Sequence, residues 1–257
     1  MTAVALTIAG SDPSGGAGIQ ADLKTFQRFG VYGEAVITLI TVQNSIAVSR
    51  VETLEPDLIA QQVHAVVSDI PPAAAKTGAL GSAEIVEAVA ELAVSFPFPL
   101  IVDPVMVSKH GARLLPSEGE DALRRKLLPR AFLITPNIPE AEVLTGATIR
   151  NERDMENAAR QLLDFGCKAV LIKGGHLEGE PVDVLRSGAG VRTFSGKRID
   201  TPHTHGTGCT YSAAITAGLA LGKSLPDAVS DAKSFVQRAI EQAPGLGRGH
   251  GPLNHAV

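Results

Sequence analysis

The sequence predicts an α/β protein in which helices cover both faces of a mostly parallel sheet. Short apolar runs alternate with longer segments of helical periodicity along most of the 257 residues. The apolar runs are continuous, which is typical of strands that are buried on both faces. No break in composition, block of charge or low-complexity linker marks a second domain, so we expect residues 1–257 to form one domain.

The elements follow from these patterns in chain order. Pro56 suits the first turn of a helix and Ser82 is a candidate N-cap, so both mark helix starts. Expected strands are 4–8, 35–39, 73–76, 100–102, 132–134 and 169–172, followed by a hairpin of 182–185 and 191–194. Expected helices are 19–29, 56–70, 82–95, 151–165, 209–221 and 226–243.

Composition narrows the functional class. The net charge is −4, whereas a nucleic-acid binder needs a basic surface that releases counterions. Aromatic residues make up only 4% and tryptophan is absent, which disfavours a protein that stacks bases. Glycine accounts for 26 of the 257 residues, above its usual share of about 7%, and this excess indicates tight backbone turns.

Three features indicate the cytoplasm. Only two cysteines occur, Cys167 and Cys209, which excludes a disulfide scaffold and fits a reducing compartment. The N-terminal apolar run ends at residues 10–13, Gly-Ser-Asp-Pro, without the basic segment and cleavage site of a signal peptide. No uncharged apolar run approaches the roughly 20 residues that span a bilayer. We therefore expect a cytoplasmic protein that binds neither membrane nor nucleic acid.

The strongest local motif is the segment 205–210, His-Gly-Thr-Gly-Cys-Thr, directly before an apolar helix. Its glycines allow backbone amides to converge at a helix N-terminus, where partial positive charge favours an anion such as a phosphate. A tight loop with a threonine N-cap is the alternative. We expect the helix dipole to lower the pKa of the Cys209 thiol, so that it can accept a proton. Burial as a small hydrophobe is the alternative for Cys209 and the expectation for Cys167.

Two other interpretations of these motifs are weaker. His203, His205 and Cys209 could ligate zinc, but no second Cys/His pair follows at a suitable spacing. Residues 16–21 match the dinucleotide pattern G-x-G-x-x-G/A, yet they do not follow a strand directly and lack the acidic residue about 20 positions on. We favour a loop whose backbone approaches a small ligand, with Asp22 nearby. On its own, Asp22 would more often be a solvated helix residue.

Polar residues follow three of the expected strands. Asp103, Asn137 and Lys173 each come soon after an apolar run, and ligands of open α/β sheets bind beyond the carboxyl ends of the strands. We therefore expect these side chains at one edge of the sheet. Asp103 and Glu140 would suit Mg²⁺, which needs only one or two carboxylates. A capped helix start, with Glu140 in the first turn, is an equal alternative.

A resemblance to a known family extends along nearly the whole chain. It is carried by residues 6–22, 42–44, 103–106, 135–137 with Glu140, 173–176 and 205–209. With these segments the chain resembles the vitamin-kinase branch of the ribokinase-like superfamily, and most of all the hydroxymethylpyrimidine/phosphomethylpyrimidine kinase family of thiamine biosynthesis. Cys209 is discriminating, because most of the superfamily carries aspartate at that position.

The resemblance implies a fold, a reaction and partners. The fold would be a three-layer αβα sandwich with a mostly parallel sheet, in a homodimer that uses ATP and Mg²⁺. The reaction would phosphorylate 4-amino-5-hydroxymethyl-2-methylpyrimidine and then convert the monophosphate to the diphosphate. The alternatives are a pyridoxal/pyridoxine kinase on the same fold, a pyrimidine-sensing protein without turnover and an NAD-dependent oxidoreductase.

The resemblance also assigns roles by position. Gln43 and Asp22 would hydrogen-bond the aminopyrimidine, because an amide pairs donor with acceptor and a carboxylate accepts from an amine. Cys209 would take the proton of the substrate hydroxyl. The other implied residues are Gly10 and Val107 in the substrate pocket, Gly206 and Gly208 in the anion hole, Asn137, Lys173 and Thr207 at ATP, and Glu140 and Asp103 at Mg²⁺. Family members often carry a bulky apolar residue where Ala79 stands, which leaves recognition on that side of the ring open.

Overall fold

A sheet of nine strands forms the centre of the computed structural model, which describes residues 2–257. Its strands are β1 (Val4–Ser11), β2 (Tyr32–Gln43), β3 (Val48–Thr53), β4 (Ala74–Thr77), β5 (Leu100–Val102), β6 (Leu133–Ile134), β7 (Ala169–Ile172), β8 (Val182–Ser187) and β9 (Gly190–Ser195). Their order is β3-β2-β1-β4-β5-β6-β7-β8-β9. The strands from β2 to β7 in this order run parallel, and β3, β8 and β9 join antiparallel at the edges.

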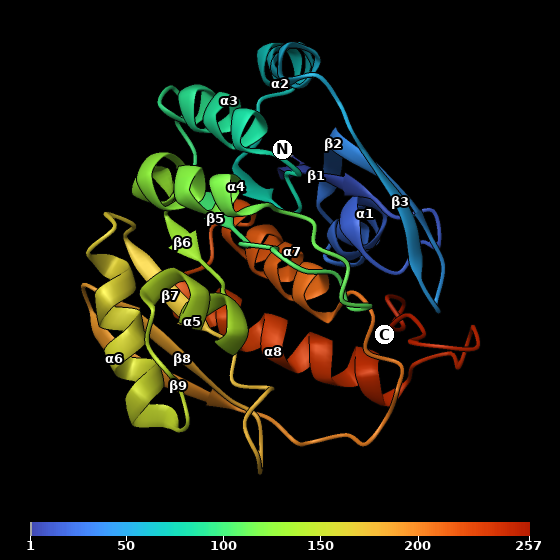
Figure 1. Cartoon of the computed structure of the whole chain (residues 1–257), viewed down its shortest axis with the longest axis vertical. Coiled ribbons are helices and arrows are strands. Elements are labelled where there is room, and N and C mark those ends of the chain that lie inside the picture. The colour runs from blue at the N-terminus through green and yellow to red at the C-terminus, as the bar shows by residue number, and fades with distance from the viewer. Residues whose placement is uncertain (1) are drawn as a thin grey trace.

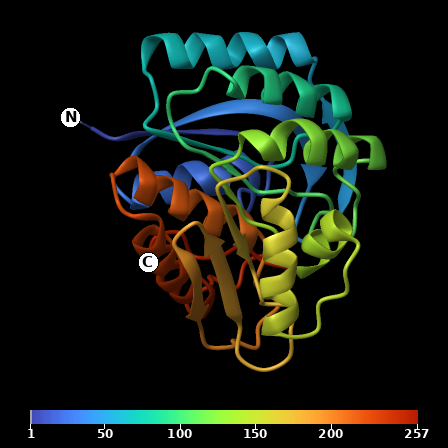
Figure 2. The same cartoon turned by 90° about the vertical axis from the view of Figure 1, so that its left-hand side faces the viewer.

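Helices cover both faces of the sheet (Figures 1 and 2). They are α1 (Gly18–Arg28), α2 (Pro56–Asp69), α3 (Ala83–Ala93), α4 (Ser117–Ala122), α5 (Ile138–Thr145), α6 (Glu152–Leu163), α7 (Thr207–Ala220) and α8 (Leu225–Glu241). A π-helical turn (Leu123–Leu127) and a 3-10 turn (Leu128–Arg130) follow α4. Helices α2 to α6 pack on one face, and α1, α7 and α8 pack on the other. The predicted three-layer αβα sandwich is confirmed.

Alternation along the central strands explains the two layers of helices. Val102 and Ile134 belong to the core with α2 to α6, whereas their neighbours Ile101 and Leu133 pack with α7 and α8. Because successive strand side chains point to opposite faces, a sheet covered twice needs continuous apolar strands. Helix α7 is buried at every residue from 210 to 218, since it lies between the sheet and its neighbours α1 and α8. Within residues 2–257, no helix has the length and apolar character needed to cross a bilayer.

The predicted helix starts are confirmed in detail. Pro56 stands in the first turn of α2, and the Ser82 hydroxyl accepts a hydrogen bond from the amide of Ile85 at 3.3 Å, as an N-cap does. The structure contains elements that the sequence patterns do not predict, and these lie where the sequence is polar. The pattern of apolar runs misses β3, because this edge strand is mostly exposed and carries the surface ion pair Arg50–Glu52. It also misses α4, a single short helix with two acidic residues in its first turn.

One buried carboxylate lies at the amino ends of the parallel strands, opposite the carboxyl ends where the site is predicted. Glu34, near the start of β2, is only 7% exposed, and its Oε2 has no hydrogen-bond partner among the described residues. Burial, together with the like charge of Asp69, raises the pKa of Glu34 to about 7. The unfolded chain ionises this group near its ordinary value of 4.5. As pH rises from about 4.5 to 7, the folded protein therefore loses stability, and above 7 the loss is complete.

Glu34→Gln should therefore stabilise the protein at pH 8 but not at pH 4. The amide mimics the protonated acid, so we expect a gain on the order of 1 kcal/mol at pH 8, after allowance for screening by solvent. Urea unfolding at both pH values measures the difference. Glu87→Gln, on the exposed face of α3, is the matched control and should show no such dependence on pH. An equal effect of Glu34→Gln at both pH values would contradict the pKa assignment.

Candidate active site

The carboxyl edge of the parallel strands gathers the predicted polar residues. Asp103 follows β5, Asn137 follows β6 and Lys173 follows β7. Asn137 and Lys173 form a parallel backbone bridge, and Lys173 Nζ lies 2.9 Å from Asp103 Oδ1. The expectation that these three residues share one edge of the sheet is therefore confirmed.

Asp103 is a buried carboxylate with several donors. Besides Lys173, the hydroxyl of Thr135 donates to Oδ1 at 3.1 Å and that of Ser212 donates to Oδ2 at 3.2 Å. Burial opposes ionisation, yet the ammonium groups of Lys173 and Lys76 hold the pKa of Asp103 below its ordinary value. Asp103 is therefore an anion that faces the centre of the site.

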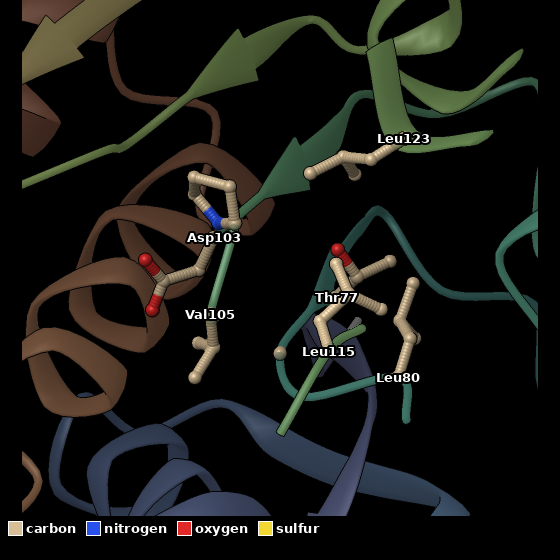
Figure 3. A pocket seen from close by; sticks show the side chains of 8 residues that line it. Thr77, Leu80, Asp103, Val105, Leu115 and Leu123 are labelled. Atoms are coloured by element: carbon tan, nitrogen blue, oxygen red, sulfur yellow. The ribbon is translucent and has the colours of Figure 1, made fainter. Parts of the chain in front are cut away.

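A small cavity beside Asp103 is not a ligand site. Its volume is about 10 Å³, which is room for roughly one water molecule. Thr77, Leu80 and Leu115 contribute to its walls, and the carboxylate of Asp103 points away from these three side chains (Figure 3). The functional face of Asp103 is therefore the one that meets Lys173 and α7.

Asn137 and Glu140 form a capping box at the start of α5. The Asn137 side chain accepts from the amide of Glu140 at 2.9 Å, and Glu140 Oε2 accepts from the amide of Asn137 at 2.8 Å. This confirms the capped helix start that the sequence suggested. Burial raises the pKa of Glu140 to about 7, although the charge of Lys173 opposes this rise. Among residues 2–257, no group of three or more His, Cys, Asp or Glu side chains is arranged to hold a metal ion.

The N-terminus of α7 approaches the loop after β1. Gly206 is the N-cap of α7 and has a φ of 80°, and a Cβ there would collide with the carbonyl oxygen of Gly16. Glycine is therefore required at position 206. A Cβ at Gly208 would lie 3.3 Å from Lys173 Nζ, so the first turn of α7 stands beside that ammonium group. Amides at a helix N-terminus next to a cation favour an anion.

The prediction for the pKa of Cys209 is wrong. Burial raises the pKa of this thiol to about 12, and the nearby carboxylates Asp22 and Asp103 act in the same direction. The cation of Lys76 and a hydrogen bond from the backbone of Gly18 favour the thiolate but do not outweigh burial. Cys209 is therefore a neutral thiol at physiological pH. Cys167 is buried and donates to the carbonyl of Leu162 at 3.5 Å, which confirms its structural role.

Asp22 belongs to a buried ion pair, so its interpretation as a solvated helix residue is wrong. Its Oδ2 lies 2.7 Å from Lys76 Nζ and accepts from the hydroxyl of Thr7 at 2.6 Å, with the Asp22 and Lys76 side chains fully buried. Its Oδ1 has no hydrogen-bond partner in the described part of the chain. Burial alone would lower the pKa of Lys76, but the carboxylate of Asp22 raises it. None of the sequence motifs includes Lys76, although a lysine that ends an apolar strand is a usable signal.

The remaining predicted residues take different positions. The Gln43 side-chain nitrogen lies 3.0 Å from Nε2 of the buried His205. Gly10 is approached by the Leu39 side chain, which occupies the space of a Cβ. Val107 is 53% exposed, so it does not form a closed wall here. The Thr207 hydroxyl donates to the carbonyl of Thr204 at 2.7 Å.

The loop after β1 does not present its glycine to a dinucleotide. A Cβ at Gly16 would meet the His205 ring at 2.6 Å and Pro252 at 3.1 Å, so this glycine permits packing within the chain. The carboxylate that organises the loop is Asp12, which accepts from the amides of Ser14 and Ala17 at 2.9 Å each. The NAD interpretation of residues 16–21 therefore has no support in the loop geometry.

Lys76→Met should destabilise the fold strongly, because it leaves the buried carboxylate of Asp22 without its cation. Breaking a buried pair in this way costs about 3–5 kcal/mol, whereas an exposed pair contributes about 0–1 kcal/mol. Chemical denaturation of Lys76→Met against Lys223→Met tests this, since Lys223 pairs with Asp231 at the surface. Adding Asp22→Asn to Lys76→Met should recover much of the loss. Similar losses for the two lysine variants would contradict the buried pair.

Comparison with known proteins is consistent with this geometry. A family model described as phosphomethylpyrimidine kinase matches residues 12–254. The hydroxymethylpyrimidine/phosphomethylpyrimidine kinase of Bacillus subtilis is 48% identical over 254 residues, which cover 98% of this chain and 94% of that protein. The thiamine biosynthesis bifunctional protein ThiED of Geobacter sulfurreducens is 49% identical over 98% of this chain. The chain spans about half of that longer protein, 52% of its length.

A solved structure shares the fold. The ADP complex of Bacillus subtilis pyridoxal kinase superposes with a TM-score of 0.91 and is 40% identical, with 100% of this chain and 98% of that chain covered. Its similarity extends over all nine strands of the sheet described above. Kinases that act on two different small alcohols are thus similar to this chain.

Proposed function

The chain belongs to the phosphomethylpyrimidine kinase family, and we propose that its site performs both kinase steps of that family's name. It is a phosphotransferase of thiamine biosynthesis. In the first step, ATP phosphorylates the hydroxymethyl group of 4-amino-5-hydroxymethyl-2-methylpyrimidine. In the second, the monophosphate becomes the diphosphate. The observation that carries this proposal is the first turn of α7, which brings its amides and Cys209 beside the Lys173–Asp103 pair.

The pyrimidine would bind beyond the ends of β1 and β2. Gln43 offers an amide donor and acceptor, and Asp22 keeps its Oδ1 without a partner among residues 2–257, so this oxygen is free to accept from the exocyclic amine. Gly10 would line the pocket with its backbone, since Leu39 fills the space that a Cβ would take there. Val107, which is 53% exposed, would supply an apolar wall against the ring.

ATP would bind on the Lys173 side of the site. Burial disfavours the ammonium of Lys173, but Asp103 and Glu140 raise its pKa, so it remains a cation for the phosphates. Asn137 and Thr207 would complete the contacts with the nucleotide.

The donor set at this edge fits Mg²⁺. Asp103 and Glu140 supply hard oxygen ligands, and Mg²⁺ takes its remaining ligands from phosphates and water. When bound, the ion neutralises negative charge on the phosphates. The capping box would support this role, because the hydrogen bond from the Asn137 amide fixes one oxygen of the Glu140 carboxylate.

Phosphoryl transfer would depend on alignment and on charge stabilisation. The transition state is loose, so preorganised amides around Gly206, Gly208 and Cys209 can stabilise the charge on the transferred group. In the first step Cys209 would first lose its own proton to solvent and would then, as a thiolate, take the proton of the hydroxymethyl group. In the second step the nucleophile is a phosphate oxygen that is already largely ionised near neutral pH, so no base is needed.

Three further properties complete the proposal. Residues 1–257 would form one domain, as the single sheet through the chain supports. The chain would form a homodimer, for which the exposed apolar side chains Ile40 and Val42 of β2 and the neighbouring Ile46 offer a surface. A cytoplasmic location fits the two free thiols.

Pyridoxal kinase activity is the second candidate, and the similarity to the ADP complex of Bacillus subtilis pyridoxal kinase favours it. Two heteroaromatic alcohols differ by few contacts, so one pocket can accept both. Gln43 and Asp22 match the aminopyrimidine better, and we therefore expect its kcat/KM to exceed that of pyridoxal.

Incubation with ATP, Mg²⁺ and the hydroxymethylpyrimidine tests the proposed function directly. Mass analysis over time should detect the monophosphate first and then the diphosphate. Parallel reactions with pyridoxal compare the two candidates. Phosphorylation of pyridoxal alone, or of neither substrate, would contradict the proposal.

Cys209→Ala should impair the first phosphorylation far more than the second. General-base help is typically worth about 10²- to 10⁴-fold, and only the first step needs it. Because the wild-type thiol is mostly protonated at neutral pH, the first-step rate should rise with pH towards the pKa of about 12, and the variant should lose this dependence. Separate kinetics with the alcohol and with the monophosphate measure both effects.

Cys167→Ala is the matched control, since Cys167 is a buried thiol that contacts α6 and lies away from the carboxyl ends of the strands. Both of its rates should stay near those of the wild type. Equal losses in the two steps for Cys209→Ala would exclude Cys209 as the base.

A further inference from the structure

His205 lies between two groups of the site and has no role in the mechanism above. It is 4% exposed, and its Nε2 lies 2.8 Å from Asp12 Oδ2 and 3.0 Å from the side-chain nitrogen of Gln43. One ring nitrogen therefore faces both a carboxylate and the amide that is proposed to read the pyrimidine. A ring nitrogen carries either a hydrogen or a lone pair, so it cannot donate to one neighbour and accept from the other.

The carboxylate of Asp12 determines whether Nε2 of His205 carries a hydrogen or a lone pair. Asp12 accepts from the Ser14 hydroxyl and amide and from the Ala17 amide, at 2.8–2.9 Å. Burial opposes its ionisation, but the hydrogen bonds from His205 and Ser14 outweigh burial and lower the pKa of Asp12. An ionised carboxylate only accepts, so the hydrogen between the two residues lies on Nε2. This holds for the neutral and for the charged imidazole.

The orientation of the Gln43 amide follows from that hydrogen. An Nε2 that carries hydrogen cannot accept from the Gln43 nitrogen, and a half turn of the amide exchanges its nitrogen and oxygen. We propose that His205 is a positioning residue that holds the Gln43 oxygen towards the imidazole and turns the NH₂ group towards the substrate ring. The ring must then offer an acceptor nitrogen to Gln43. The inference rests on the proposed role of Gln43 in binding the pyrimidine.

The surroundings of His205 suit a fixed positioning group. Its backbone amide donates to the Gly251 carbonyl at 3.1 Å, and its ring packs against Gly16. Its Nδ1 is buried without a hydrogen-bond partner in the described chain, which suits a bare nitrogen better than an unpaired N–H. His205 also directly precedes Gly206, the N-cap of α7. His205 therefore connects Gln43, which is proposed to bind the pyrimidine, with the loop that is proposed to bind the phosphoryl group.

The first experiment determines the tautomer of His205 in the ligand-free full chain. Long-range ¹H–¹⁵N correlation spectra of the ¹⁵N-labelled protein distinguish the two ring nitrogens, and His205→Gln identifies the signal by its loss. We expect a protonated Nε2 and, when the ring is neutral, a bare Nδ1. A neutral ring protonated at Nδ1 would overturn the inference. No substrate is present, so this result is independent of the proposed function.

The second experiment compares two variants in the first kinase step. His205→Gln places an amide donor near the former Nε2, whereas His205→Leu removes the donor. For His205→Leu we expect a rise of about tenfold or more in KM for the pyrimidine with little change in kcat, because a misoriented amide weakens ground-state binding. His205→Gln should stay within about threefold of the wild-type KM. The preference for the pyrimidine over pyridoxal should fall in His205→Leu alone.

Other outcomes separate the inference from its premise. Equal changes in both variants would mean a merely structural role and overturn the inference. A fall in kcat together with a rise in KM, at an unchanged substrate preference, would do the same. A wild-type protein that does not phosphorylate the pyrimidine would instead contradict the proposed function. If thermal melting shows that His205→Leu is unfolded, the tautomer of His205 decides the inference alone, because that measurement is made on the wild-type chain.

Discussion

Buried charge at the carboxyl edge of the sheet is the constraint on which the rest of the site depends. Asp22 pairs with Lys76 and Asp103 pairs with Lys173, at 2.7 and 2.9 Å, and all four side chains are buried or nearly so. An unpaired charge in such a place would be very costly, so each group is bound to its partner. The pairs connect β4, α1, β5 and β7, and they determine which atoms face the first turn of α7.

The site at this edge also requires that two backbone segments approach each other closely. Helix α7 can reach the charged pairs only because Gly206 passes directly over the carbonyl of Gly16. That contact brings the loop after β1, organised by Asp12, against the loop before α7, which carries His205. Side chains far apart in the sequence thereby meet in fixed orientations, and fixed donors stabilise charge without reorganisation during the reaction.

The sequence predicts those features that depend on local pattern. The continuous apolar strands give the sheet, and the polar residues at their ends give the shared edge of Asp103, Asn137 and Lys173. The partner of Asp22 could not be predicted in this way, because Lys76 lies 54 residues away and no periodicity connects them. The prediction for the pKa of Cys209 is wrong for a related reason. The helix dipole is visible in the sequence, whereas the burial that outweighs it arises only from packing.

The charge balance explains why a thiol suits position 209. Two buried ammonium groups, on Lys76 and Lys173, already face the two carboxylates of Asp22 and Asp103. A carboxylate at position 209, as in most of the superfamily that the chain resembles, would add a third buried anion beside Asp22 and Asp103. A thiol with a pKa of about 12 is neutral at physiological pH and preserves the balance. Cys209 can accept the substrate proton only after its own proton has left, and the nearby charge of Lys76 favours the thiolate that then acts as the base.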